Sequence, residues 1–235
     1  MNDRTFRVAG AVLVVMVGIW AGVRIHSSLT GASATTRILT PVGEASPPIP
    51  SDLLNESAPQ PANIPDRLPN FSLSDLEGKS TSIAAWNGKS LVINFWATWC
   101  APCRREIPLL EGLSGEWRDR GVQVVGIAVD HRDPVATYAR QLKIAYPILI
   151  GEQDALDVAA SLGFDSPVFP FTVFTDRRGE VVALYVGELH ESQATLILSV
   201  VQDLNQDHIE LKEARRSIAD GLHKLGPTIG PTKSG

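Results

Sequence analysis

Residues 94–108 of this 235-residue chain have the sequence NFWATWCAPCRREIP. The stretch that leads into them, SLVINFWA (90–97), is apolar on both faces except at Asn94, as in a central strand that is covered on both sides. Residues 100–120 follow a helical pattern that ends at a glycine. Both cysteines of the chain therefore lie where a buried strand gives way to a helix.

Strand-like and helix-like segments alternate along the rest of the chain. Two late strands flank Asp176-Arg-Arg-Gly179, a turn with Asp at its first place and Gly at its fourth. The order predicts an α/β fold of the thioredoxin layout, a central mixed sheet flanked by helices. The predicted strands are 122–129, 146–150, 171–175 and 181–186, and the predicted helices are 133–142, capped by Asp133, 155–162 and 191–203.

The cysteine count limits the chemistry. A composition that is 44% hydrophobic and 20% charged is that of a globular protein, and a net charge of -5 argues against nucleic-acid binding. Cys100 and Cys103 are the only cysteines, too few for a disulfide framework, a four-Cys zinc site or an iron–sulfur cluster. Zinc would need two further ligands, and the five histidines include no pair spaced as His-x3–5-His. No metal and no cofactor is predicted.

The Cys-Ala-Pro-Cys spacing at a helix start favours redox chemistry. Free N–H groups and the helix dipole lower the pKa of the first thiol, so Cys100 is the predicted exposed nucleophile. Cys103, one turn inward, is the predicted resolving thiol, and the two form a redox-active disulfide. Pro102 suits the first turn, where a missing N–H costs nothing. A structural bridge across so short a loop would stabilise little.

The sequence from Asn94 to Pro108 resembles the signature of TlpA/ResA-type membrane-anchored thioredoxin-like proteins. The similarity covers residues 68–204, including the lead-in PNFSL (69–73) and the turn at 176–179. It implies a thioredoxin fold that faces the periplasm or outer membrane surface and exchanges dithiols for disulfides. Many members of this family act as reductants in cytochrome c maturation.

The resemblance also assigns a substrate-binding surface. Pro170 matches the proline that is cis in thioredoxin folds and packs against the cysteine pair; Pro167 is its nearest competitor. Phe169 departs from the small, β-branched or Leu residue that often precedes this proline, which alters the surface that a substrate peptide lies along. Trp99 precedes the nucleophile, where an aromatic is either core or docking surface. With Pro102, these residues form the predicted substrate-binding set, while Trp96 is expected in the core.

Glu106 is the third predicted catalytic residue. It lies three residues beyond Cys103 on one helical face and matches a glutamate that ResA-type proteins place near the pair. There it could relay a proton to Cys103. The alternative is a surface glutamate paired with Arg104 or Arg105. Asn94 stands where ordinary thioredoxin has a buried aspartate, and an amide cannot act as a base.

The N-terminus carries a targeting segment. Residues 8–23 are uncharged between Arg7 and Arg24, close to the shortest length that spans a bilayer. The basic flank before them predicts a single-pass inner-membrane anchor, with the N-terminus in the cytoplasm and the domain in the periplasm. Ala32-Ser-Ala34 has the form of a cleavage site, so a cleaved signal peptide and a soluble periplasmic protein stay open.

The composition suggests four segments. Residues 1–26 are the anchor or signal peptide, and residues 27–69 hold half of the 16 prolines and form a Pro-rich tether. Residues 70–204 are the thioredoxin-like domain. Residues 205–235 are a helical extension with a flexible tail.

The predicted function is a thiol–disulfide oxidoreductase of the bacterial cell envelope that reduces disulfides in exported proteins. Candidate substrates are an apocytochrome c and a copper-site protein, and a membrane thiol carrier is the expected electron donor. A peroxiredoxin-like peroxidase is an alternative, although no Pro-x3-Thr-x2-Cys loop is present. A copper chaperone is another, although the only methionines are Met1 and Met16.

Overall fold

The computed structural model describes residues 64–226. The predicted anchor at 1–26 and most of the predicted tether at 27–69 lie outside these residues, as does the end of the predicted tail. None of the helices within 64–226 combines the length and the apolar character that crossing a bilayer requires.

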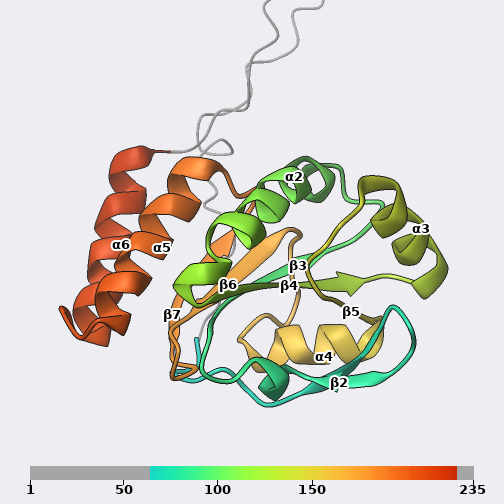
Figure 1. Cartoon of the computed structure of the whole chain (residues 1–235), viewed down its shortest axis with the longest axis horizontal. Helices are drawn as coiled ribbons and strands as arrows, with labels where there is room; N and C mark the ends of the chain where they lie inside the picture. Colours follow the sequence, from blue (N-terminus) through green and yellow to red (C-terminus); the bar gives the residue numbers. More distant parts are fainter. Residues whose placement is uncertain (1–63, 227–235) are drawn as a thin grey trace, which may run out of the picture. The chain divides into compact units, whose positions relative to one another are not determined.

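A seven-stranded mixed sheet forms the centre of the described part (Figure 1). The strand order is β2-β1-β5-β4-β3-β6-β7, and β3 pairs parallel with β4 and antiparallel with β6. The predicted thioredoxin-like mixed sheet is therefore confirmed. The strands are β1 (Ser72–Asp75), β2 (Ser80–Ser82), β3 (Ser90–Trp96), β4 (Val122–Val129), β5 (Ile148–Gly151), β6 (Phe171–Thr175) and β7 (Val181–Val186).

Helices cover both faces of the sheet. The helices α2, α3 and α5 cover one face, and α4 covers the other (Figure 1). Their buried side chains belong to two separate hydrophobic clusters. The helix α6 lies against α5 and β7. The helices are α2 (Ala101–Glu116), α3 (Arg132–Leu142), α4 (Gln153–Ser161), α5 (Glu191–Asn205) and α6 (Leu211–Leu225), with 3-10 turns η2 (Ile83–Trp86) and η3 (Arg118–Arg120).

Strand β3 is buried along its whole length, as its sequence predicts. Val92 and Trp96 belong to the hydrophobic cluster beneath α2, while Ile93 and Phe95 belong to the cluster on the opposite face. Trp96 is fully buried, so its predicted place in the core is confirmed. Asn94 is the polar exception, and its alternation along the strand places it on the α2 face.

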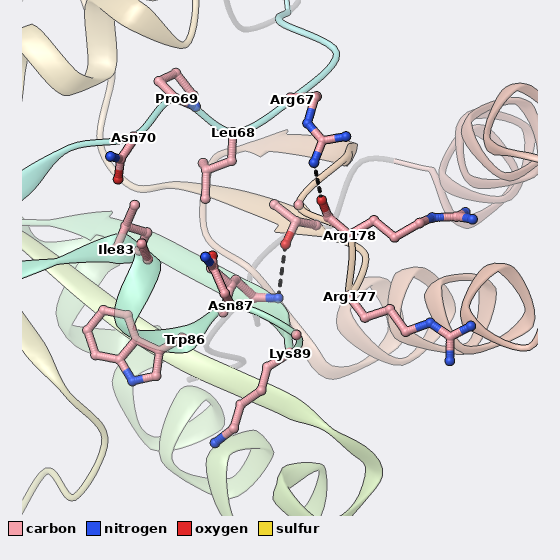
Figure 2. Close-up of a pocket in the computed structure, with 15 residues that line it drawn as sticks. Arg67, Leu68, Pro69, Asn70, Ile83, Trp86, Asn87, Lys89, Arg177 and Arg178 are labelled. Carbon is pink, nitrogen blue, oxygen red and sulfur yellow. Dashed lines mark hydrogen bonds between the residues drawn. The ribbon is translucent and has the colours of Figure 1, made fainter.

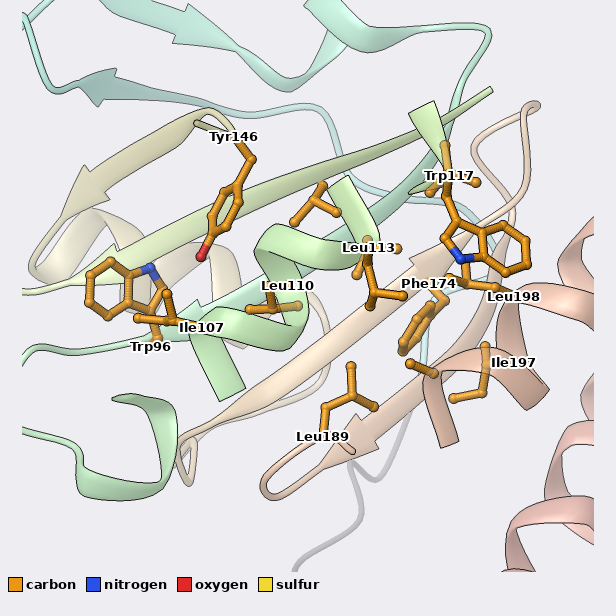
Figure 3. Close-up of a cluster of buried hydrophobic side chains, with 14 of the residues drawn as sticks. Trp96, Ile107, Leu110, Leu113, Trp117, Tyr146, Phe174, Leu189, Ile197 and Leu198 are labelled. Carbon is orange, nitrogen blue, oxygen red and sulfur yellow. The ribbon is translucent and has the colours of Figure 1, made fainter. Parts of the chain in front are cut away.

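The cluster beneath α2 anchors the helix that carries the cysteines. Ile107, Leu110 and Leu113 of α2 lie in one cluster with Trp96, Tyr146, Phe174 and side chains of α5 (Figure 3). Burying an aliphatic side chain of this size stabilises the fold by about 1.5–3 kcal/mol. The N-terminus of α2 is therefore held firmly against the end of β3.

The predicted helix over 100–120 is shorter than expected. The α-helix ends at Glu116, and η3 leads to Gly121, whose φ of 77° lies in the left-handed region. Trp117 is buried at this break, and the Arg120 guanidinium lies 4.6 Å from its ring centroid. Sequence periodicity does not distinguish an α-helical last turn from a 3-10 turn.

Other boundaries also differ. Asp133 is not the cap of α3, because the N-cap is His131. Asp133 lies in the first turn, where its negative charge interacts favourably with the helix dipole. The short strands β1 and β2 are absent from the sequence prediction, since Leu73 is their only buried residue. The bounds of β5, α4 and α5 are displaced by one or two residues.

Residues 66–68 pack against the hairpin of β6 and β7. The Leu68 N–H donates to Gly179 O at 2.9 Å, and the Val181 N–H donates to Asp66 O at 2.9 Å. The Arg215 side chain of α6 bonds both Asp66 and Val181 O. Residues 66–68, which the sequence prediction assigns to the tether, are thus bonded to the domain.

Candidate redox-active site

Cys100 and Cys103 form a disulfide at the N-terminus of α2, with Cα atoms 5.3 Å apart. Cys100 is the N-cap residue, and the Cys103 N–H donates to its Sγ at 3.2 Å. When Cys100 is a thiolate, the same N–H and the helix dipole favour the negative charge. The backbone thus activates the first sulfur.

Both sulfurs are sheltered in the disulfide form. Cys100 is 5% exposed and Cys103 is fully buried, because both residues pack within the hydrophobic cluster beneath α2. The prediction of an exposed Cys100 is therefore wrong for this oxidised state. Cys100 is the more exposed residue of the pair, and its role as the nucleophile stays a prediction.

Aromatic side chains surround this end of the sheet. The Phe169–Pro170 bond is cis, as predicted, whereas Pro167 is not cis. Trp99 is 67% exposed, so it belongs to the surface and not to the core. Its ring contacts Phe169 edge-on with centroids 6.1 Å apart, and Phe169 stacks on Phe171 at the same distance.

Glu106 lies on the buried side of α2. Its Oε1 accepts from Asn94 Nδ2 at 2.7 Å, and its Oε2 accepts from the Leu189 N–H at 2.8 Å. The alternative of a surface glutamate paired with an arginine is wrong, because Arg105 bonds Glu188 instead.

The pKa of Glu106 is raised to about 7. Burial is the main cause, and the nearby charge of Glu188 adds to it. The hydrogen bonds from Leu189 and Asn94 oppose this rise. Near neutral pH the carboxyl can therefore both hold and release a proton.

Asn94 supports Glu106 and does not replace it. Its amide donates to Glu106 and, at 3.0 Å, to Thr172 Oγ1. Its Oδ1 has no hydrogen-bond partner within residues 64–226. An amide that donates to the carboxylate fixes its orientation, and Glu106 is the titratable side chain of this pair.

Some contributors to the site escape sequence analysis. The Leu189 N–H and Thr172 reach Glu106 and Asn94 from distant parts of the chain. Leu189 contributes a backbone group, which every residue except proline has, so no side-chain motif marks it. Thr172 is one of several β-branched residues in β6 and carries no distinguishing pattern.

A polar cavity of about 330 Å³ lies away from the cysteines, around the turn between β6 and β7 (Figure 2). Its basic side chains are engaged locally. Arg67 donates to Arg178 O at 2.6 Å, and Arg178 bonds the buried Asp176 at 2.9 Å. No cysteine lines this cavity, so it is not the redox site.

A Cys-x-x-Cys disulfide that caps a helix after the central strand of a thioredoxin fold defines a thiol–disulfide oxidoreductase. The model of the Redoxin family matches residues 64–198, and the chain belongs to this family. Within it, the chain is of the TlpA/ResA type, which confirms the resemblance noted in the sequence.

Named relatives agree with this assignment. The thiol-disulfide oxidoreductase ResA of Halalkalibacterium halodurans is 32% identical over 144 residues, which cover 60% of this chain and 78% of the relative. ResA of Bacillus cereus is 30% identical over 131 residues, 55% of this chain and 73% of the relative. The fold also resembles a secreted thiol-disulfide isomerase from Corynebacterium glutamicum, with a TM-score of 0.54 and 23% identity over 73% of this chain and 99% of that one.

Proposed function

We propose that this oxidoreductase reduces disulfides in exported proteins within the bacterial cell envelope, held at the inner membrane by residues 8–23. The observation that supports the exchange chemistry most directly is the arrangement at the N-terminal end of α2. There the Cys103 N–H bonds Cys100 Sγ, and a buried Glu106 with a pKa of about 7 lies on the same helix. This arrangement suits a thiolate nucleophile followed by proton removal from a second thiol.

The proposed reaction has two exchange steps. The Cys100 thiolate attacks one sulfur of a substrate disulfide, forming a mixed disulfide, and the other substrate sulfur leaves as a thiolate that takes a proton from water. Cys103 then loses its proton and attacks Sγ of Cys100, which releases the second substrate thiolate. Two electrons pass to the substrate, and the Cys100–Cys103 disulfide is the product.

Glu106 serves the second step. Cys103 is fully buried, and burial disfavours its charged form. The ionised Glu106 carboxylate receives the proton of Cys103 as Cys103 attacks, and its neutral acid form is stable in the same apolar surroundings. The position of Glu106 one turn beyond Cys103 on α2 supports this role.

The proposed docking surface comprises Trp99, Pro102 and Phe169, and the predicted fourth member, Pro170, is buried. Trp99 is exposed beside Cys100, and Phe169 supports its ring. An exposed aromatic side chain that lies against a second ring presents a large apolar contact to a peptide. Pro102 is half-buried in the first turn of α2, and Pro170 follows Phe169 across the cis bond.

The proposed substrates are an apocytochrome c or a copper-site protein with a cysteine pair. A membrane thiol carrier is the proposed electron donor, because an oxidising compartment does not itself keep the dithiol reduced. The names of the ResA relatives support dithiol–disulfide exchange as the chemistry.

A trapping experiment tests this function. In full-length protein, Cys103→Ser removes the resolving thiol, so a substrate attacked by Cys100 stays attached and can be identified by mass spectrometry. The matched control is Cys100→Ser, which leaves only the buried Cys103. Trapped exported proteins on the first variant alone are expected; no trapped partner on either variant would overturn the proposal.

Two further measurements test the direction of electron transfer and the attachment of the protein to the membrane. The reduction potential of the pair is expected to be low, as in a disulfide reductant, and a strongly oxidising potential would make the protein a disulfide donor. The full chain is expected to stay with the membrane after carbonate extraction, whereas a chain without residues 1–26 is expected in the soluble fraction.

A further inference from the structure

A surface ion pair lies next to the buried carboxyl of Glu106. Arg105 Nε lies 3.0 Å from Glu188 Oε1 and 2.8 Å from Oε2, and Arg105 Nη2 makes a further bond to Oε2. Arg105 belongs to the first turns of α2, and Glu188 to the connection between β7 and α5. A bidentate pair of this kind fixes geometry as well as charge.

A second link joins the same two segments on the buried side. The residue after Arg105 is Glu106, and the residue after Glu188 is Leu189, whose N–H donates to Glu106 at 2.8 Å. Two adjacent residues of α2 thus hold two adjacent residues of the connection, one contact outside and one inside. The connection also bonds the cis-proline loop, because the Gly187 N–H donates to Pro170 O at 2.9 Å.

We infer that Arg105 and Glu188 form a clamp that positions the Leu189 N–H against Glu106 and sets the charge around it during the attack of Cys103. Both are positioning residues, since neither side chain needs to touch the reacting sulfurs. The inference rests on the proposed role of Glu106 in the second exchange step.

The surroundings of Glu106 contain few other charges. Asn94 of β3 faces it as a neutral amide, and the connection after β7 contributes the Leu189 N–H and the charge of Glu188. Tyr146, from the connection before β5, is near enough to feel the charge of Glu106, and burial raises the pKa of its hydroxyl, so it is neutral. Among these neighbours, Glu188 is the acidic residue whose charge raises the pKa of Glu106, and Arg105 pairs with it.

Replacing Glu188 and replacing Arg105 should therefore shift the ionisation of Glu106 in opposite directions. Glu188→Gln keeps the size of the side chain and an oxygen that can accept from Arg105, so the link that positions the Leu189 N–H is kept while a negative charge that disfavours ionised Glu106 is removed. Arg105→Gln leaves Glu188 without its counter-charge. A merely structural pair would shift stability in both variants but would not separate them in this way.

The test measures the resolving step by itself. Reduced full-length protein reacts with Ellman's reagent at Cys100, and the second release of coloured thiol reports the attack of Cys103 as a function of pH. We expect Glu188→Gln to lower the pH midpoint of this release by about half a unit and Arg105→Gln to raise it by about as much. Arg177→Gln, which alters an exposed ion pair at the far end of β6, is the matched control and is expected to leave the midpoint unchanged.

The outcomes separate the clamp from the proposed function. Midpoints of both variants that coincide with the wild-type value, or that move in the same direction, would overturn the clamp while leaving the exchange reaction intact. A wild-type protein that shows no second release at any pH would overturn the proposed function, and the clamp with it. Melting temperatures measured on the same samples show whether each variant is folded.

Discussion

Replacing Glu106 with Gln tests the central electrostatic argument. The variant keeps the size of the side chain and one hydrogen-bonding oxygen but carries no charge. Burial raises the pKa of Glu106 from an ordinary value of 4.5 to about 7. A difference of about 2.5 units corresponds to roughly 3 kcal/mol between the two protonation states.

The direction in which the free energy of unfolding changes with pH follows from proton linkage. At pH values below the unfolded-state pKa, Glu106 is protonated in both the folded and the unfolded chain and favours neither. As the pH rises through the folded-state pKa, the unfolded chain has already lost the proton, and the folded chain must bury a charge. The free energy of unfolding of the wild type therefore falls by about 3 kcal/mol between pH 4.5 and 8, relative to Glu106→Gln.

Urea unfolding of the oxidised proteins at several pH values measures this difference. Groups that titrate in both proteins cancel when the wild type is compared with the variant. Glu116→Gln is the matched control, because Glu116 is exposed on the same helix and its curve should run parallel to that of the wild type. A difference between wild type and Glu106→Gln that stays constant from pH 4.5 to 8 would refute the burial argument.

Two other substitutions test docking and packing. Trp99→Ala is expected to raise the KM for a disulfide-bonded peptide about tenfold or more and to leave the rate with Ellman's reagent unchanged, because the indole is 67% exposed; an unchanged KM would remove Trp99 from the docking surface. Gly126→Ala is expected to destabilise the fold by about 1–3 kcal/mol in urea, since its Cβ would lie 3.0 Å from Trp96 Nε1 and 3.2 Å from Tyr146 Cε2. Gly115→Ala has no atom within 4 Å of its Cβ and is the control, and equal midpoints for the two variants would contradict the packing argument.

The central part of the fold follows from local sequence patterns. The bounds of β4, β6 and β7 agree with the prediction because buried strands consist of continuous apolar runs between turn residues. The strands β1 and β2 could not be predicted, because they are short and Leu73 is their only buried residue, so they carry little apolar signal. The cap of α3 was misplaced because Asp before Pro is a common helix start, whereas the backbone here enters the helix two residues earlier.

At the site, too, some neighbours follow from sequence spacing and others depend on the tertiary fold. Cys100, Cys103 and Glu106 are neighbours on one helix, so their spacing alone places them together. The bond from Leu189 to Glu106 spans 83 positions and depends on the tertiary fold. The surface or buried position of Glu106 also depended on that fold, because a glutamate in the second turn of a helix suits either environment.

The packing of Phe169 links substrate binding to the thermal stability of the protein. Phe169 is partly buried and packs against the hydrophobic clusters on both faces of the sheet, and no other residue within 64–226 belongs to both. A peptide that covers this ring would extend both cores at once, and a ligand that binds only the native state raises the melting temperature. Heat denaturation could thus serve as a label-free screen for substrates, without any need for the exchange reaction to proceed.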